Sequence, residues 1–155
     1  MPSKKFTPGG FDMSVRRSRA GLGLFTNEPI AKGACVIEYT GVRIPEKDVE
    51  KSRSRYLFEI SPRRTIDGSP RWNTARYINH SCRPNCEIEI DTRRGRVFIL
   101  SKRAIQAGEE LSYNYGKDYF DAFINGGCRC VKCQPDFAPP GVKSTIRLKK
   151  KGSRQ

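Results

Sequence analysis

A ten-residue stretch, R-Y-I-N-H-S-C-R-P-N at positions 76–85, brings an imidazole, a thiol, a hydroxyl and an amide next to one another. It holds the only histidine among 155 residues, His80, next to the amide of Asn79 and close to the thiol of Cys82. An apolar pair precedes Asn79, and Pro84 prevents a helix from continuing, so we predict a turn that leaves a buried segment. Turns that gather donors and acceptors in this way usually bind something.

Simpler interpretations apply to the residues of this stretch taken one at a time. A lone histidine such as His80 is often a hydrogen-bonded core residue, and a lone cysteine such as Cys82 often packs as a small hydrophobic group. The string as a whole is far less common than its parts. The combination therefore favours a functional role.

The length and composition predict one domain with a single core. Hydrophobic residues make up 36% and charged residues 30% of the 155 positions, which is ordinary for a globular protein. No apolar run approaches the roughly 18 residues that span a bilayer, and Met1–Gly10 lacks the apolar centre of a signal peptide. We therefore expect an intracellular protein without a membrane segment, or one exported by a route that leaves no apolar signal.

The charge is strongly basic. Thirty Lys and Arg against 16 Asp and Glu give a formal charge of +14, which favours a polyanionic partner such as nucleic acid. Basic residues without any acid occupy 143–155, and such a run predicts a flexible tail. Two interpretations of this tail stay open, a solvated extension and a segment that binds polyanions.

Period-two alternation and clusters of β-branched and aromatic residues predict many short strands. These strands are predicted at 11–15, 34–42, 56–60, 65–68, 86–90, 96–100 and 111–116. Short helices or helical turns are predicted at 45–51, 72–78 and 118–124. The segments 86–90 and 96–100 form a hairpin, and Gly21 and Gly23 mark a tight turn. The fold class is therefore mostly β, built from several small sheets with short helices.

Four motifs occur in an order that resembles the SET-domain protein lysine methyltransferases. They are G-x-G at 21–23, Y-x-G at 39–41, R-x-x-N-H-S-C-x-P-N at 76–85 and E-L-S-Y-N-Y at 110–115. The resemblance implies the SET-domain fold, in which a C-terminal segment makes a knot-like crossing that brings the motifs together. It places a SET domain at 11–116, after a flexible lead-in at 1–10. One departure is Asn114, which stands where the family usually has Asp.

The resemblance implies transfer of a methyl group from S-adenosyl-L-methionine to a lysine. Free lysine has a pKa of about 10.4, so the site must favour the neutral amine, which an apolar channel and a nearby sulfonium both do. It must also align amine, methyl and sulfur. By resemblance, Tyr115 is the catalytic tyrosine and Tyr39 the channel tyrosine that hydrogen-bonds the amine. Tyr113 leaves little room for several methyls, so we predict mainly mono-methylation.

The same resemblance implies which residues hold the cofactor. They are Gly21, Leu22, Gly23, Tyr56, Arg76, Asn79, His80 and Tyr115. For any one tyrosine among them, the alternative is a strand residue packed on the core with its hydroxyl at the rim.

The cysteines predict a metal site. Six cysteines in a chain without a secretion signal favour thiols or metal over disulfides. Cys128, Cys130 and Cys133 provide three thiolates, and Cys82 is the natural fourth ligand of a tetrahedral zinc site. This set resembles the post-SET zinc site, with its usual C-x-C-x4-C shortened, and assigns 117–142 to a post-SET-like segment. The alternative is reduced cysteines without metal, while Cys35, in a strand pattern, is expected to pack in the core.

The sequence therefore predicts a SET-type protein-lysine N-methyltransferase with one structural Zn²⁺. The expected substrate is a histone, a histone-like protein or a ribosomal protein, with nucleic acid contacted through the basic surface and tail and no membrane contact. The location would be the cytoplasm in a bacterium, or the nucleus and chromatin in a eukaryote or for a host-targeted protein. The alternative function is a basic SET-fold module that binds nucleic acid without turnover.

Overall fold

The computed structural model describes residues 4–116, 128, 130, 132, 133 and 135. The predicted helix at 118–124 and the basic tail at 143–155 lie outside the described residues. The elements in chain order are η1 (Lys4–Phe6), β1 (Met13–Ser18), β2 (Gly21–Thr26), β3 (Cys35–Tyr39), β4 (Val42–Ile44), α1 (Glu46–Val49), β5 (Leu57–Ser61), β6 (Arg64–Asp67), η2 (Thr74–Tyr77), β7 (Asn79–His80), β8 (Cys86–Asp91), β9 (Arg96–Ser101) and β10 (Ser112–Tyr113).

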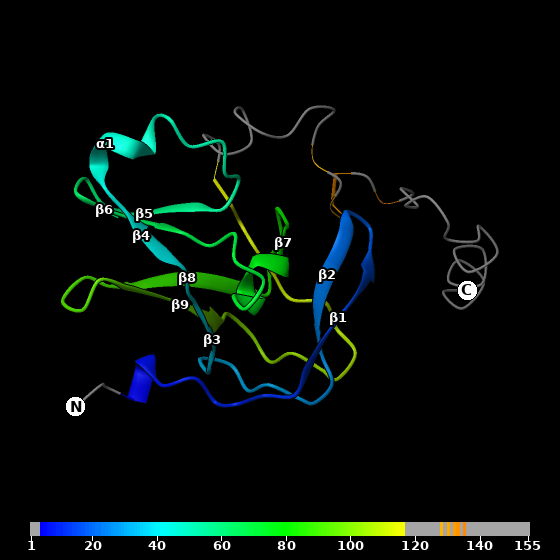
Figure 1. Ribbon diagram of the computed structural model, residues 1–155. Coiled ribbons are helices and arrows are strands. Elements are labelled where there is room, and N and C mark those ends of the chain that lie inside the picture. Colours follow the sequence, from blue (N-terminus) through cyan, green and yellow to red (C-terminus); the bar gives the residue numbers. More distant parts are fainter. Residues whose placement is uncertain (1–3, 117–127, 129, 131, 134, 136–155) are drawn as a thin grey trace, which may run out of the picture.

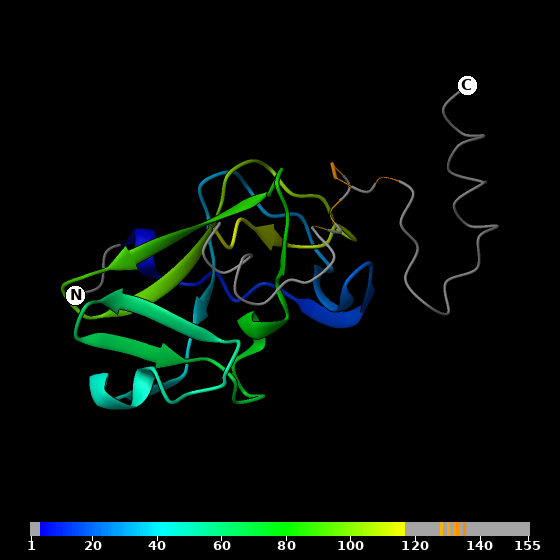
Figure 2. The same cartoon turned by 90° about the horizontal axis from the view of Figure 1, so that it is seen from above.

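The described strands form four small sheets, which confirms the predicted mostly β fold class. Strands β1 and β2 form an antiparallel hairpin, and two three-stranded sheets have the orders β3-β9-β8 and β4-β6-β5. Strands β7 and β10 pair in parallel. Figure 1 shows the β4-β6-β5 sheet with α1 on one side of the molecule and the β1-β2 hairpin on the other. The view from above in Figure 2 separates the β8-β9 ribbon from the β5-β6 ribbon.

The core lies between these sheets because each strand turns one apolar face inward. Strand β9 is the most deeply buried, with Val97, Phe98 and Ile99 fully inaccessible to solvent. The main core cluster comprises Leu24, Ile30, Val36, Tyr39, Ile60, Ile66, Ala75, Ile78, Cys86, Val97, Ile99, Ile105, Leu111 and Tyr113. Cys35 packs with Phe98 in a second buried cluster, which confirms its predicted role in the core.

Several predicted elements are confirmed. The hairpin pairs Cys86 with Ser101 and Asp91 with Arg96, and the helical turn predicted at 72–78 is η2. The short helix predicted at 45–51 is α1. No helix in the described part of the chain is long and apolar enough to cross a membrane.

Three predicted elements were wrong in detail. The turn before β2 is formed by Arg19 and Ala20, so the two glycines of G-x-G lie within the strand, where Gly21 adopts a φ of +100°. The first strand begins at Met13, two residues later than predicted, and continues to Ser18, three residues beyond the predicted 11–15.

The strand predicted at 34–42 is divided into β3 and β4 by Thr40 and Gly41. The Thr40 N–H bonds the Asn73 side chain, and a Cβ on Gly41 would lie 2.2 Å from the Asp67 carbonyl oxygen. The chain bends here because it must pass close to another backbone segment.

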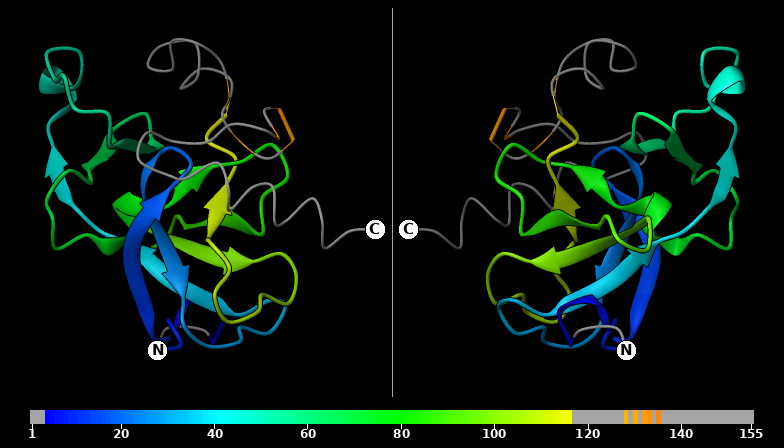
Figure 3. Two further views of the ribbon diagram at one scale, coloured as in Figure 1. Left: turned by 90° about the vertical axis from the view of Figure 1, so that its right-hand side faces the viewer. Right: turned by 90° about the vertical axis from the view of Figure 1, so that its left-hand side faces the viewer.

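The last predicted strand, 111–116, is reduced to the two residues of β10, because its neighbours pair with other segments. Leu111 N–H donates to the Leu24 carbonyl of β2, while Ser81 N–H donates to the Tyr113 carbonyl. The C-terminal end of the domain thus runs beside β7 and contacts β2, two segments far apart in sequence, as the expected crossing requires. Figure 3 shows β10, in yellow, beside β7 in green.

Candidate active site

Four tyrosines from three separate segments converge on one pocket of about 350 Å³. Its lining residues are Tyr39, Arg55, Tyr56, Leu57, Phe58, Glu59, Arg76, Tyr113 and Tyr115. The structure therefore brings together all three predicted catalytic tyrosines and three of the predicted cofactor residues. The predicted residues among them come from distant parts of the sequence, apart from Tyr113 and Tyr115, which are separated by one residue.

Main-chain carbonyls orient two of the phenols. The Tyr39 hydroxyl donates to the Tyr56 carbonyl at 2.8 Å, and the Tyr115 hydroxyl donates to the Ile78 carbonyl. A phenol that donates its proton to a main-chain carbonyl keeps its oxygen lone pairs as acceptors for another donor. Gly68 makes room for Tyr39, since a Cβ at this position would lie 2.4 Å from the phenol oxygen.

The rings of the pocket hold one another in place. The Tyr113 and Tyr115 ring centroids lie 4.9 Å apart, and the Arg76 guanidinium lies 4.5 Å from the centroid of the Tyr56 ring. Tilted aromatic and cation–π contacts of this kind fix side-chain orientation. The Arg76 Nε is buried without a hydrogen-bond partner among the described residues. A buried unpaired donor beside a pocket is the kind of group that a ligand satisfies.

Asn79 joins β7 to the G-x-G strand. Its side-chain amide nitrogen donates to the Leu22 carbonyl at 2.8 Å, the Ser18 hydroxyl at 2.9 Å and the Glu110 carboxylate at 2.9 Å. The predicted cofactor residues on β2 and on β7 are therefore in direct contact. The side chain of Asn79 is committed to this link.

His80 connects the pocket to the cysteines. Its Nδ1 accepts the Tyr115 N–H at 3.0 Å, and its Nε2 lies 3.5 Å from the Cys82 sulfur. Burial lowers the pKa of His80, so the ring is neutral at pH 7. A neutral ring that accepts at Nδ1 carries its proton on Nε2, directed at Cys82.

Glu110 is a site residue to which the sequence analysis assigned no role. Burial raises the pKa of Glu110, while the hydrogen bonds from Asn79 and Ser18 oppose that rise. The same carboxylate explains why position 23 is a glycine, because a Cβ there would lie 2.4 Å from a Glu110 oxygen. Glu110 is the first residue of the E-L-S-Y-N-Y motif and directly precedes the buried Leu111. This position in the motif was the one sequence signal that could have indicated a role for Glu110.

Asn85 is the second residue without an assigned role. It is 3% exposed. Its amide donates to the Glu110 carbonyl at 2.8 Å, and its side-chain oxygen accepts the Ser112 N–H at 2.9 Å. Asn85 therefore ties the end of the histidine stretch to the segment that carries Tyr113 and Tyr115.

The four cysteines predicted to bind metal lie together. Their sulfur atoms all fall within 4.8 Å of one another. The Cys82 sulfur is 3.8 Å from that of Cys128 and 3.6 Å from that of Cys133. A tetrahedral zinc with Zn–S bonds of about 2.3 Å separates its sulfurs by about 3.8 Å, so the cluster fits this ion.

The protonation of one thiol, Cys130, also suits a metal, whereas burial raises the pKa values of Cys82 and Cys128. Burial alone would raise the pKa of Cys130, but hydrogen bonds from Cys82, Cys128 and Cys133 lower it to about 6. A thiolate is the form that ligates zinc. By contrast, burial raises the pKa of Cys86 to about 12, which marks an inert core thiol.

The family model described as "SET domain" matches residues 21–116. This chain belongs to the SET-domain family. The match lies within the domain predicted at 11–116 and contains every predicted catalytic residue. The SET-domain fold of this chain also agrees with its solved relatives.

Relatives of this SET domain include the histone-lysine N-methyltransferase trr of Drosophila melanogaster, 41% identical over 127 residues. That match covers 75% of this chain and 5% of trr. The human histone-lysine N-methyltransferase 2D is 38% identical and also covers 75% of this chain, which spans 2% of its length. The chain thus corresponds to a small part of these relatives.

A solved relative is KRYPTONITE in complex with mCHG DNA and SAH, with a TM-score of 0.61 and 36% identity over 70% of this chain and 24% of that one. A second KRYPTONITE complex, with mCHH DNA, an H3(1-15) peptide and SAH, has a TM-score of 0.59, 35% identity and a cover of 69% and 24%.

Proposed function

We propose that this SET domain transfers a methyl group from S-adenosylmethionine to the side-chain amine of a protein lysine. The observation that carries the proposal is the convergence of Tyr39, Tyr113 and Tyr115 on one pocket beside the Asn79-His80 strand. Relatives named as histone-lysine N-methyltransferases, and a solved relative that holds SAH, support the same reaction and cofactor.

The tyrosines can position an amine without fixing it as an ion. The lysine must lose its proton to water before it attacks, because an ammonium ion has no free lone pair, and a pocket with aromatic walls favours the neutral form. The phenol oxygens of Tyr39 and Tyr115 can accept the remaining N–H bonds of the amine, since their own protons are directed at main-chain carbonyls. Alignment of this kind supplies much of the rate enhancement in a displacement reaction.

The cofactor site is proposed at the junction of β2, β7 and the pocket. The cofactor supplies a methyl group on a positively charged sulfur. Gly21 and Leu22 are exposed residues, and the unpaired Nε of Arg76 offers a donor at the pocket wall. Asn79 and His80 act mainly by holding β2 and Tyr115 in position, and Tyr56 lines the wall.

The product is proposed to be mainly monomethyl-lysine. Tyr113 is 8% exposed and lines the pocket next to Tyr115. Its hydroxyl occupies space and can bind the amine or a water molecule, so a lysine that already carries methyl groups fits less well.

Zinc is proposed as a structural ion bound by Cys82, Cys128, Cys130 and Cys133. It would connect the post-SET-like segment to the histidine stretch, because Cys82 lies two residues after His80 and contacts its ring. The metal thereby supports the orientation of His80 and, through it, the Tyr115 main chain. It takes no part in the transfer itself.

A histone or histone-like protein bound to DNA is the proposed substrate, and chromatin in the nucleus the proposed location. A chain of charge +14 repels a free basic tail, whereas DNA attracts the enzyme to a basic protein bound to it. The H3 peptide and DNA held by the KRYPTONITE structures support this choice.

The test is transfer of radiolabel from S-adenosylmethionine to nucleosomes, free histones, a DNA-bound histone-like protein and ribosomal proteins. Tyr115→Phe should reduce transfer on the order of 100-fold, because a misplaced amine loses that much rate. Ser14→Ala is the control, since it removes a hydroxyl that donates to Asn27 and does not line the pocket. Equal transfer by Tyr115→Phe contradicts the assignment, and DNA binding by the wild type without any transfer favours the non-catalytic module.

A further inference from the structure

A second cluster of charged side chains lies at two turns that the methyl-transfer site does not use. The β5–β6 turn reads S-P-R-R at 61–64, and the β8–β9 turn reads D-T-R-R-G at 91–95. With Arg43 of β4, the exposed arginines Arg43, Arg63, Arg64 and Arg93 form what we call the two-turn arginine surface. The surface and the tyrosine pocket lie at different ends of β5. Leu57–Glu59 line the tyrosine pocket, whereas Ile60 and Ser61, at the C-terminal end of the strand, lie beside the arginines.

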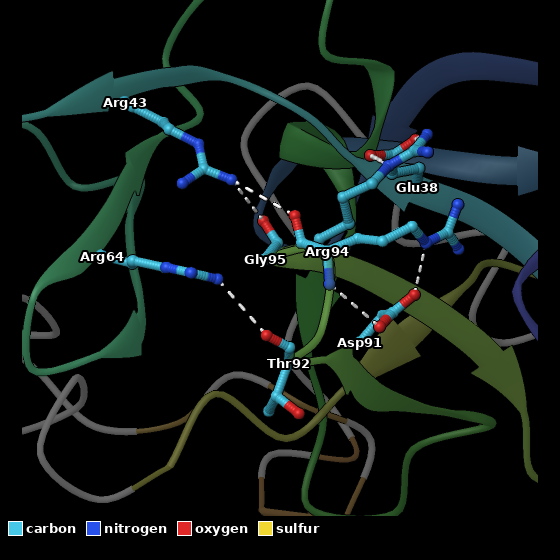
Figure 4. A network of polar contacts seen from close by, with 8 residues as sticks. Glu38, Arg43, Arg64, Asp91, Thr92, Arg94 and Gly95 are labelled. Atoms are coloured by element: carbon cyan, nitrogen blue, oxygen red, sulfur yellow. Dashed lines mark hydrogen bonds and ion pairs between the residues drawn. The ribbon is translucent and has the colours of Figure 1, made fainter. Parts of the chain in front are cut away.

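The two turns are held against each other by this surface. The Arg43 Nη2 donates to the Gly95 carbonyl at 3.2 Å, and the Arg64 Nη1 donates to the Thr92 carbonyl at 3.3 Å. Figure 4 shows both guanidinium groups reaching from β4 and β6 toward the turn. A Cβ on Gly95 would lie 2.7 Å from the Arg43 Nη2, so glycine allows this approach.

These contacts use few of the available donors. A guanidinium carries five N–H bonds, and carbonyl contacts through one nitrogen leave the others directed at solvent. The arginines are thus preorganised, and ordering them for a ligand costs less conformational entropy.

Nearly all the positive charge of the surface is uncompensated. Asp91 is the only acid in the two turn sequences. The Arg94 Nε binds it at 2.5 Å, and this hydrogen bond lowers the pKa of Asp91. Arg94 therefore neutralises Asp91, and the four arginines of the surface repel one another until an anion binds.

A hollow of about 350 Å³ lies between the turns. It is lined by Ile60, Ser61, Pro62, Arg63, Arg64 and Thr92. Two arginines and two hydroxyl side chains at one hollow match the acceptors of a phosphate group, which arginine binds through paired N–H bonds.

We propose that the two-turn arginine surface binds the phosphate backbone of duplex DNA. A duplex presents one negative charge per about 1.7 Å of its axis, so several phosphates can meet the four arginines at once. An acidic peptide presents its carboxylates less densely. The choice of DNA rests on the proposed function, in which the substrate protein is itself bound to DNA.

Binding of a fluorescent duplex to the full chain, followed by anisotropy without cofactor or substrate, tests the proposal. Arg63→Ala with Arg93→Ala removes two charges whose side chains make no hydrogen bond described in the structure. Because each phosphate contact contributes about 0.9 to the slope of log K against log salt, this variant should lower the slope by roughly 2 and weaken binding on the order of tenfold. Arg63→Lys with Arg93→Lys should restore most of the binding.

The matched control is Lys32→Ala with Lys102→Ala. It removes the same charge from exposed residues at the opposite end of β9, where Gly33 N–H bonds the Ser101 carbonyl. The control should leave the salt slope unchanged. Equal losses of DNA affinity in the arginine and lysine variants would mean that only the overall charge matters and would contradict the proposal. No loss of affinity in either variant would exclude this surface as the DNA-binding site.

Two further measurements complete the test. Loss of polyglutamate binding in the arginine variant, with DNA binding intact, would replace DNA by an acidic protein as the partner. Methyl transfer to a free peptide should stay unchanged in the arginine variant, while transfer to the DNA-bound substrate falls. Failure of the methyltransferase proposal would appear as no transfer in either case and would leave the DNA-binding result to be decided by the anisotropy measurements.

Discussion

Asn85→Ala is the substitution that most directly tests how the histidine stretch and the tyrosine segment are held together. It leaves two partly buried main-chain groups without their side-chain partner, the Glu110 carbonyl and the Ser112 N–H. An unsatisfied buried group costs about 1–3 kcal/mol and partial burial places each of these at the low end, so the free energy of unfolding should fall by about 2–3 kcal/mol. This is a large part of the roughly 5–15 kcal/mol that stabilises a domain. The melting temperature should fall by roughly 5–15 °C.

Urea unfolding followed by circular dichroism, with zinc present, measures this cost. The control is Asn27→Ala, which removes an exposed amide that accepts one hydrogen bond from Ser14 and should change stability by less than about 0.5 kcal/mol. Methyl transfer at low temperature, where the variant is folded, should also fall because Tyr113 and Tyr115 lose their anchor. A cost for Asn85→Ala no larger than that of Asn27→Ala would refute this account.

Three further predictions concern the pocket, the metal and pH. Tyr113→Phe should increase the yield of di- and trimethyl-lysine measured by mass spectrometry. The role of the Tyr113 phenol would be contradicted if trimethyl-lysine were the main product of the wild type, or if the variant gave no more di- and trimethyl-lysine than the wild type. Cys130→Ser should lose both bound zinc and transfer, whereas Cys35→Ala should keep its zinc; full activity after chelation, with zinc shown to be absent, would overturn this prediction. Glu110 has an ordinary pKa of 4.5, which burial raises in the folded state. Just above pH 4.5 the folded protein therefore binds more protons than the unfolded protein, so the free energy of unfolding of the wild type falls as pH rises through that window. Glu110→Gln should remove this dependence, and unfolding free energies that differ from wild type by a constant amount across this window would rule it out.

Local patterns predicted the elements whose contacts are close in sequence. The β8–β9 hairpin follows from two alternating segments around Asp91–Gly95, and η2 follows from the mixed pattern before Ile78. The positions of the wrong boundaries share a cause. Thr40 bonds Asn73, and Leu111 bonds Leu24, so long-range hydrogen bonds ended strands that local propensity would have continued.

The candidate site divides in the same way. The family resemblance of the four motifs was sufficient to name Tyr39, Tyr115 and Asn79 as candidates, and the clustering of the cysteines to name candidate metal ligands, because unusual polar strings are visible in one dimension. The roles of Glu110 and Asn85 were not visible there, since each is defined by a partner more than 20 residues away.

The amino-acid sequence by itself determined the family, the basic charge and the set of side chains able to perform the chemistry. Only the tertiary structure decided which of those side chains face a pocket and which hold the strands together, and it alone joined Arg43, Arg63, Arg64 and Arg93 into one surface. The physical reason is that hydrogen bonding and charge act across a few ångströms of space. Neither depends on how many residues of chain lie between the groups.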